Sequence, residues 1–291
     1  MIRSLIRSMR PMQWSKNVFV LAPLIFAQKL GSMTHVTIAA WAFLSFCLLA
    51  SGVYLLNDCL DMEEDRKHPI KKLRPIAAGE IPVAVALGFA LVLSLSSLVV
   101  AHSLGTPFLL SLLSYLAINL GYSLGLKHIV ILDVMMITAG FVIRAVSGAI
   151  ALNVVLSHWL VLCTTMVALF LAFTKRRQEL LHLGNDAHKH RRSLSQYNVG
   201  FLDQMISVST STTLMAYALY CTSPEVVHRF GTDGLKWTIP FVIFGVFRYL
   251  YLIHVRQVQG DPTATLLDDI PSLFNVAAWG GTVLWILYAC T

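Results

Sequence analysis

The sequence predicts an all-α integral membrane protein, a bundle of nine transmembrane helices in one polytopic domain over residues 1–291. Three observations support this fold class. Of the residues, 56% are hydrophobic and only 13% are charged, whereas a soluble domain carries about 25% charged residues. The mean hydropathy is +0.69. The apolar residues also gather into stretches of the length that a helix needs to cross the hydrocarbon core, about 20 residues.

The expected elements follow one another along the whole chain. Residues 1–16 contain "IRSLIRSM", in which apolar and basic residues recur at helical spacing, so this N-terminal segment is expected to lie on the membrane surface. Pro23 interrupts the first span and makes it the weakest. The nine expected spans are 17–32, 34–56, 82–102, 106–126, 129–151, 157–174, 199–221, 236–254 and 273–290.

The basic residues predict how the spans are oriented. With the N-terminus in the cytoplasm, most of the 22 Lys and Arg residues fall on the cytoplasmic side. The opposite side receives Lys29, Arg229 and Lys236, while Arg144 and Arg248 lie inside expected spans. Because cytoplasmic loops of membrane proteins are enriched in Lys and Arg, this asymmetry supports both the orientation and the number of spans.

Two long polar loops, 57–81 and 175–198, are expected on the cytoplasmic side, after the second and the sixth span. Their equivalent positions suggest a weak internal repeat with two loops at one mouth. The net charge of +7 is interpreted as topology and as contact with anionic membrane lipids. No nucleic-acid partner is expected.

The first loop begins with an acidic cluster. Asp58, Asp61 and Asp65 stand at i, i+3 and i+7, which places them on one face of a helix, and Asn57 adds a neutral oxygen. Such an oxygen-only set favours a hard cation, Mg²⁺ or alternatively Mn²⁺, whose remaining ligands are often water and phosphate oxygens. The three aspartates are therefore the candidate metal ligands and catalytic residues, and a diphosphate is the expected ligand.

A simpler interpretation is a solvated helix end. The carboxylates would then pair with the basic residues that follow them, which are Arg66, Lys67, Lys71 and Lys72. Glu63 and Glu64 point off the shared face and are expected to be solvated in either case.

The stretch "NDCLDMEEDRKHP" resembles the N-D-x-x-D-x-x-x-D motif of the UbiA-type membrane prenyltransferase superfamily, and "YSLGLK", from Tyr122 to Lys127, resembles its Y-x-x-x-K element. The resemblance extends over the nine-span outline. Superfamily members that make quinones or haem carry a second D-x-x-x-D motif after the sixth span. Here that loop opens with "KRRQEL" and contains only Glu179 and Asp186 as acids, which favours an additional phosphate group over a second metal.

One branch of the superfamily, the decaprenyl-phosphate phosphoribosyltransferases, shares this departure. The blocks "RPMQWSKN", "HPIKKLRPIAAG", "FVIRAVSGA", "KRRQEL", "FRYLYLIH" and "GDPTATLLDD" resemble that branch. The resemblance implies a Mg²⁺-dependent transfer of 5-phosphoribosyl from phosphoribosyl pyrophosphate to a polyprenyl phosphate, with release of pyrophosphate. It also implies a multi-pass enzyme of the bacterial inner membrane whose active site faces the cytoplasm. The oligomeric state is left open, with a homo-oligomer as one alternative.

The candidate substrate-binding residues are polar side chains at the cytoplasmic ends of expected spans, together with one arginine inside a span. They are Arg10, Lys16, Asn17, Asn57, Lys71, Arg74, Tyr122, Lys127, Arg144, Lys175, Arg176 and Glu179. Lys175 and Arg176, with Arg177, are assigned to the C5 phosphate of the donor, and Arg10 and Lys16 to the lipid phosphate or the sugar.

The arginines inside spans have structural alternatives. Arg144 could be held by Asp133 of the same span, and Arg248 could pair with Asp269 across the last cytoplasmic loop, since a guanidinium within a membrane needs a partner or a polar cavity.

Two other functions agree with parts of the sequence. A prenyltransferase that acts on an aromatic or other small acceptor keeps the metal motif, but the basic second loop argues against it. A transporter for an anionic solute would explain arginines inside spans, but it gives no reason for the acidic cluster.

Overall fold

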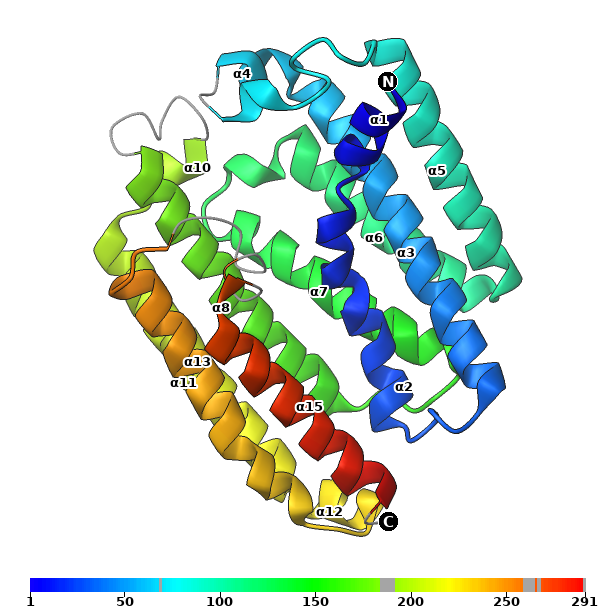
Figure 1. Ribbon diagram of the computed structural model, residues 1–291, viewed down its shortest axis with the longest axis vertical. Coiled ribbons are helices and arrows are strands. Elements are labelled where there is room, and N and C mark those ends of the chain that lie inside the picture. The colour runs from blue at the N-terminus through cyan, green and yellow to red at the C-terminus, as the bar shows by residue number, and fades with distance from the viewer. Residues whose placement is uncertain (68–69, 184–191, 259–264, 266–267, 290–291) are drawn as a thin grey trace. The chain divides into compact units, whose positions relative to one another are not determined.

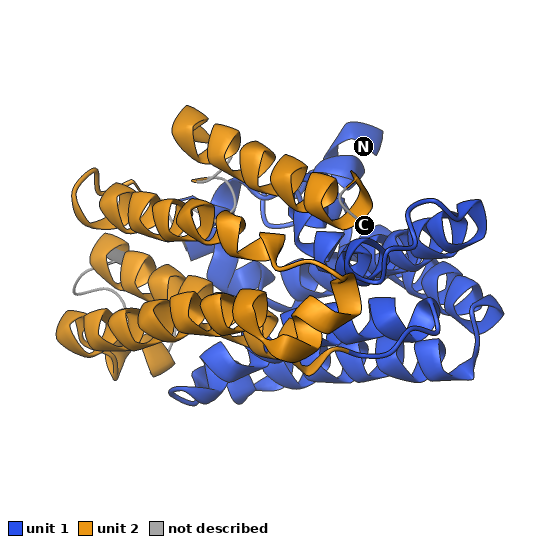
Figure 2. Ribbon diagram, turned by 90° about the horizontal axis from the view of Figure 1, so that it is seen from below, with its two compact units in different colours: residues 1–156 blue, residues 157–291 orange. Residues whose placement is uncertain are grey.

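The computed structural model describes residues 1–67, 70–183, 192–258, 265 and 268–289, and every regular element within these ranges is a helix. The contacts divide the chain into two compact units, Met1–Leu156 and Ser157–Thr291, which Figure 2 colours separately. The expectation of a single membrane domain stays a prediction. Asp186, Lys189 and Arg191 of the second loop, and residues 259–264, lie outside the described residues.

Unit 1 begins with the N-terminal segment that is expected at the membrane surface, and it contains the helices around the acidic cluster (Figure 1). Its elements are α1 (Ile2–Met9), the 3₁₀ helix η1 (Pro11–Leu21), α2 (Ala22–Phe26), α3 (Met33–Leu60), α4 (Met62–Lys67), η2 (Lys71–Leu73), α5 (Val83–Ser103), α6 (Thr106–Leu124), η3 (Leu126–His128) and α7 (Leu132–Ala151).

Unit 2 contains α8 (His158–Leu183), α10 (Arg192–Ser195), α11 (Val199–Thr222), α12 (Pro224–Phe230), η5 (Gly234–Thr238), α13 (Ile239–His254) and α15 (Ile270–Ala289). In each unit, the helices that flank the long polar loop pack closely on one another, α3 on α5 and α8 on α11. This shared arrangement agrees with the weak repeat expected from the sequence.

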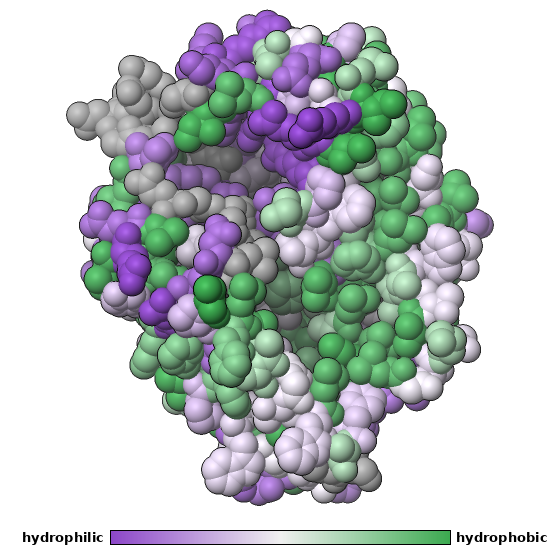
Figure 3. All heavy atoms as spheres, viewed as in Figure 1, coloured by the Kyte–Doolittle hydropathy of each residue, from purple (hydrophilic) through white to green (hydrophobic). Residues whose placement is uncertain are grey.

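Some long helices expose many apolar side chains, as α5 shows. Leu91, Val92 and Val99 of α5 are exposed although they are hydrophobic. In unit 1, hydrophilic residues gather around α1 and α4, whereas the outer side of α5 is hydrophobic (Figure 3). A helix that exposes apolar residues is suited to contact with lipid.

Seven of the described helices are long and apolar enough to cross a membrane. They are 33–60, 83–103, 106–124, 132–151, 158–182, 234–254 and 270–289. The windows expected at 17–32 and 199–221 are not among them, so the number of nine spans stays a prediction. Each of the two windows has a physical reason for the difference.

The first window is divided between η1 and α2, neither of which is a long α-helix. A 3₁₀ helix rises about 2.0 Å per residue instead of about 1.5 Å, so Pro11–Phe26 covers about 30 Å with few residues. The segment packs tightly on α7, because a Cβ on Gly148 would lie 2.1 Å from the carbonyl oxygen of Val20. Only glycine allows this approach.

The second window is α11, which has 24 residues but many hydroxyl side chains. Its hydroxyls donate to the carbonyl one turn earlier, as from Ser211 to Ser207 (2.9 Å) and from Thr213 to Ser209 (2.7 Å). Such bonds satisfy a hydroxyl inside its own helix. The low hydropathy of α11 therefore overstates the cost of placing it in a membrane.

Candidate active site

The acidic cluster lies at the junction of α3 and α4, where the helical hydrogen bonds continue past the end of α3. The amide of Asp61 donates to Asn57 O (2.9 Å), and the amide of Asp65 donates to Asp61 O (2.8 Å). Asp58 and Asp65 are buried, with 2% and 3% of their surface exposed. The three carboxylates thus lie on two helices that meet at Asp61, whereas the spacing in the sequence predicts a single helical face.

Two arginines from different segments hold the buried carboxylates. Arg74 Nη1 donates to Asp58 Oδ1 (3.0 Å) and to Asp65 Oδ2 (2.6 Å), so one guanidinium nitrogen bridges both side chains. Arg10 Nη2 donates to the same oxygen of Asp58. Buried carboxylates without such partners would be strongly destabilised. Arg10 and Arg74, both expected to bind substrate, are therefore brought to the expected metal ligands.

Backbone geometry directs Arg10 to this place. It ends α1 in the left-handed region (φ 53°), a conformation that is uncommon for residues other than glycine and that often marks a functional site. Its guanidinium also lies 5.0 Å from the centre of the Tyr54 ring. Tyr54, one helical turn before Asp58, was missed in the sequence, although its spacing from the aspartate could have indicated it.

The segment "YSLGLK" supplies the partner of the third carboxylate. Lys127 Nζ donates to Asp61 Oδ1 (3.0 Å). Gly125 ends α6 at φ 155°, a conformation that side chains rarely adopt, and the chain turns there into η3. Ser123 Oγ donates to Asn57 Oδ1 (2.6 Å), so Asn57 is held from the same segment. Ser123 was not among the predicted site residues, although it lies inside the motif.

The partners differ from those of the simpler solvated-end interpretation. Arg66 pairs with Glu63 (2.8 Å) three residues earlier, and both side chains are largely exposed. Glu63 and Glu64 are exposed, as expected. The buried aspartates instead contact cations from outside their own helix. Buried ion pairs between different elements are typical of a functional polar site. Exposed ion pairs at a helix end, in contrast, contribute little to stability.

The donor set agrees chemically with a hard divalent cation. Asp58 and Asp65 offer oxygens to a single positively charged nitrogen, which shows that a cation fits between them. Among the described residues, however, no three His, Cys, Asp or Glu side chains lie close enough together to hold a metal ion. Asp61 instead forms an ion pair with Lys127. A complete three-carboxylate site would require Asp61 to leave this partner.

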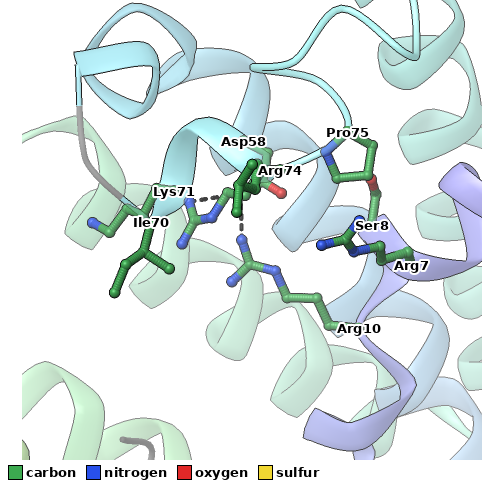
Figure 4. Close-up of a pocket in the computed structure, with 9 residues that line it drawn as sticks. Arg7, Ser8, Arg10, Asp58, Ile70, Lys71, Arg74 and Pro75 are labelled. Carbon is green, nitrogen blue, oxygen red and sulfur yellow. Dashed lines mark hydrogen bonds and ion pairs between the residues drawn. The ribbon is translucent and has the colours of Figure 1, made fainter.

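A pocket of about 330 Å³ opens beside this cluster. Figure 4 shows Arg7 and Lys71 on opposite sides of the ion pairs that Arg10 and Arg74 make with Asp58. The residues that line the pocket are Arg7, Ser8, Arg10, Asp58, Ile70, Lys71, Leu73, Arg74 and Pro75. Lys71, Arg10 and Arg74 were expected to bind substrate, whereas Arg7 and Ser8 were not. Lys16 and Tyr122 are half-buried and do not line this pocket.

Arg144 lies in α7, buried, and holds the segment that follows Arg10. It donates to Asn17 Oδ1 (2.7 Å), Gly140 O (2.8 Å) and Tyr115 OH (2.7 Å). Asp133 is not among its partners, so the structural pairing considered for these two residues is wrong. The positive charge of Arg144 is stabilised by neutral oxygens and by the Tyr115 ring, whose centre lies 4.6 Å from the guanidinium carbon. Arg144 therefore fixes Asn17, which itself is buried.

In unit 2, the basic residues lie near the end of α8. Arg176 is buried and pairs with Glu179 (2.5 Å). Arg177 pairs with Asp203 of α11 (2.5 Å). Lys175, Arg176 and Glu179 thus lie within two helical turns, as the sequence predicts. Asp203 was missed, since it stands outside any motif.

A third ion pair in unit 2 is the one considered from the sequence. Arg248 donates to both oxygens of Asp269, at 3.0 and 2.8 Å. Asp269 also accepts from the amide and the hydroxyl of Ser272 (3.0 and 2.7 Å) and thereby caps α15. The hydrogen bond from Arg248 lowers the pKa of the Asp269 carboxyl, and the bonds from Ser272 act in the same direction.

Comparison with characterised proteins gives this site a context. Decaprenyl-phosphate phosphoribosyltransferase of Mycolicibacterium smegmatis is 33% identical to this chain over 297 residues, which cover 99% of the chain and 93% of that protein. The protein of the same name from Corynebacterium glutamicum is 34% identical, with 98% and 86% covered.

Solved structures agree with the fold. A UbiA homologue from Archaeoglobus fulgidus, bound to GPP and Mg²⁺, superposes with a TM-score of 0.73 at 17% identity and covers 98% of this chain and 99% of that one. The same homologue bound to DMAPP and Mg²⁺ gives 0.74 at 16% identity, with the same shares covered. The model of the UbiA prenyltransferase family matches residues 18–289. This chain is therefore an enzyme of the UbiA prenyltransferase family.

Proposed function

We propose that this enzyme transfers a 5-phosphoribosyl group from phosphoribosyl pyrophosphate to a polyprenyl phosphate and releases pyrophosphate. One observation carries the proposal. The relatives with about a third of their residues identical over nearly the whole chain are named decaprenyl-phosphate phosphoribosyltransferases. The basic end of α8 supports it, because "KRRQEL" replaces the second acidic motif of prenyl-transferring members and suits a donor with an additional phosphate.

The proposed topology has nine spans and the active site at the cytoplasmic face of the bacterial inner membrane. The roughly 30 Å length of Pro11–Phe26 and the internally bonded hydroxyls of α11 support the two spans beyond the seven long apolar helices. The distribution of Lys and Arg supports the orientation.

The proposed reaction is a substitution at C1 of the ribose. The bond from C1 to the diphosphate oxygen breaks, and the diphosphate leaves with the electron pair. An oxygen of the polyprenyl phosphate, already an anion at neutral pH, forms the new bond from the opposite face. Positive charge develops on the ribose ring as the bond stretches, as in glycoside chemistry. The nucleophile carries no proton that must be removed, so the reaction requires no general base.

The acidic cluster and its cations have complementary roles in this proposal. Asp58, Asp61 and Asp65 would hold Mg²⁺, which neutralises charge on the leaving diphosphate. Arg74 and Lys127, which rest on these carboxylates, bind phosphate oxygens once the carboxylates are otherwise engaged. Asn57 is oriented by Ser123, and Asn17 by Arg144. Lys16 and Tyr122 remain proposed substrate contacts. Lys175 and Arg176 are proposed to bind the C5 phosphate, and Glu179, which pairs with Arg176, is proposed to orient that arginine.

The decisive experiment offers the purified protein two donors in parallel. With Mg²⁺, a polyprenyl phosphate and phosphoribosyl pyrophosphate, a mass spectrum of the lipid fraction should show a phosphoribosyl lipid. With a prenyl diphosphate and an aromatic acceptor, no prenylated product should form. The reverse outcome would assign the chain to prenyl transfer, the reaction class of its structural neighbours' ligands.

A further inference from the structure

The pocket beside the acidic cluster contains a buried hydroxyl that has no hydrogen-bond partner among the described residues. Ser8 has 1% of its surface exposed, and within the described residues its Oγ makes no hydrogen bond. Nearly all buried hydroxyl groups in proteins have a partner. Ser8 lines the pocket, so an oxygen of a ligand held there would supply the missing bond.

The pocket also carries more positive charge than its carboxylate balances. Four of its lining residues are cationic, Arg7, Arg10, Lys71 and Arg74, and Asp58 is the single acid among them. Arg10 and Arg74 both contact Asp58, and Arg74 also pairs with Asp65, which does not line the pocket. Arg7 has no ion-pair partner in the described part of the chain, and Figure 4 shows it extending toward the cluster from the side of Ser8. This arrangement is suited to an anion with several acceptor oxygens.

The edge of the pocket is apolar and lies beside a membrane-surface helix. Ile70 and Leu73 line it, and each has 59% of its surface exposed. On α1, which supplies Arg7 and Ser8, Ile2 and Ile6 are also exposed, as in helices that lie in the membrane interface. A cationic base with an apolar rim at the interface fits the phosphate end of a lipid better than a sugar phosphate that arrives from water.

We infer that this pocket binds the phosphomonoester of the polyprenyl phosphate acceptor. Arg7 and Ser8 donate hydrogen bonds to its oxygens, and Ile70 and Leu73 contact the first isoprene unit. The inference rests on the proposed function, because it takes the acceptor from there. It adds two residues that the sequence motifs do not mark, and it places the acceptor phosphate beside the carboxylates that are proposed to hold the donor.

The test is a binding measurement on the full-length protein in neutral detergent, without turnover. Farnesyl phosphate, ribose 5-phosphate and farnesol are titrated calorimetrically into wild type, Arg7→Gln, Ser8→Ala and Arg3→Gln. Arg3 is the matched control, since it is an exposed arginine of the same helix that does not line the pocket.

Arg7→Gln should weaken farnesyl phosphate about 10-fold, the effect of one charge-assisted hydrogen bond. Ser8→Ala should weaken it about 5-fold, as expected for a neutral bond. Because this variant also removes an unsatisfied buried hydroxyl, its Tm without ligand should not fall. Ribose 5-phosphate and farnesol should bind all four proteins alike, and Arg3→Gln should behave as wild type.

Three outcomes would overturn the inference. The first is unchanged farnesyl phosphate binding in Arg7→Gln. The second is an equal loss for ribose 5-phosphate, which would make the pocket a donor site. The third is an equal loss in Arg3→Gln, which would indicate general attraction of lipid to α1. If Arg7→Gln loses farnesyl phosphate but wild type forms no phosphoribosyl lipid, the subsite stands and the proposed reaction fails.

Discussion

Asp58 is the residue on which the site converges, since it accepts from both Arg10 and Arg74 while almost wholly buried. Asp58→Asn keeps the shape and the acceptor oxygen but removes the charge. We expect it to lower phosphoribosyl transfer by at least about 10-fold to 100-fold, the range for lost support of a metal site. Glu64→Gln, an exposed acid of the same segment, is the control and should keep full activity.

The measurement is the initial rate of pyrophosphate release at several Mg²⁺ concentrations, with Tm recorded for each variant. Higher Mg²⁺ should restore part of the rate of Asp58→Asn. Equal losses in Asp58→Asn and Glu64→Gln would mean that the cluster acts only through its overall charge.

Arg74 bridges two of the proposed metal ligands and should therefore compete with a metal ion for them. In Arg74→Ala, Mg²⁺ alone should bind more tightly than in wild type, because its competitor is gone. Pyrophosphate should bind about 10-fold more weakly, because a charged donor is lost. Calorimetry with each ligand separately checks whether the affinity for Mg²⁺ rises and the affinity for pyrophosphate falls. A loss of affinity for both ligands would show that Arg74 only supports the local structure.

These contacts also show what the sequence could and could not predict about single residues. The spacing of the three aspartates is local, so helical structure around them follows directly from it, although they lie on two helices that meet at Asp61. The contacts of Arg10 with Asp58 and of Lys127 with Asp61 join residues 48 and 66 positions apart, and only the packing of helices determines them. The sequence could not indicate Ser8, because its proposed role rests on a buried hydroxyl that has no hydrogen-bond partner in the described part of the chain.

At the scale of elements, hydropathy predicted seven long apolar helices, and the two other expected spans, which depart from the common type of helix, stay predictions. The window 17–32 begins in the 3₁₀ helix η1, which has a longer rise per residue, and continues in the short helix α2. In α11, hydroxyl side chains lower the hydropathy although they are bonded within the helix. Neither feature is visible in a count of apolar residues.

The hydrogen bonds that Asp269 makes at the start of α15 should make the thermal stability of the protein depend on pH. Hydrogen bonds from Arg248 and Ser272 lower the pKa of Asp269 in the folded protein, below its unfolded value of about 3.9. Its contribution is therefore complete above that value and is lost as the pH falls through the folded pKa. Asp269→Asn should lower the Tm by about 2–4 °C at pH 7.

The difference in Tm between wild type and Asp269→Asn should stay constant from pH 8 to about pH 5 and shrink at lower pH. Asp268→Asn, an exposed neighbour, should match wild type throughout. A difference that grows on acidification would contradict the assignment.

The end of α8 is proposed to bind the C5 phosphate of the donor. Lys175→Ala should raise the KM for phosphoribosyl pyrophosphate about 10-fold and leave the KM for the lipid nearly unchanged. A donor analogue without the C5 phosphate should be a poor substrate that the mutation hardly affects further. Arg256→Ala, an exposed cation of the same unit, is the control. Additive effects of mutation and analogue would place the phosphate elsewhere.

At the scale of the whole molecule, the proposed orientation predicts which residues an impermeant thiol reagent reaches in intact cells. Glu64→Cys, in the first polar loop, should be protected until the membrane is opened. Arg229→Cys, on the opposite side, should react from outside. The wild type must be labelled in parallel as the background, because Cys59 and Cys163 are only partly buried, whereas Cys47 and Cys221 are buried. Labelling of Glu64→Cys from outside would reverse the topology.

In the proposed topology and reaction, the length of α3 determines where the chemistry takes place. Its 28 residues extend over about 42 Å, whereas the hydrocarbon core is about 30 Å thick, so a membrane-spanning α3 places Asp58 at the depth of the lipid headgroups. An acceptor lipid need not leave the bilayer, which would cost about 0.8 kcal/mol for every methylene exposed to water. It reaches the enzyme by lateral diffusion in two dimensions. The quantity that governs acceptor binding is then its mole fraction among the surrounding lipids, and dilution with inert lipid slows the enzyme even when the amount of acceptor per volume is constant.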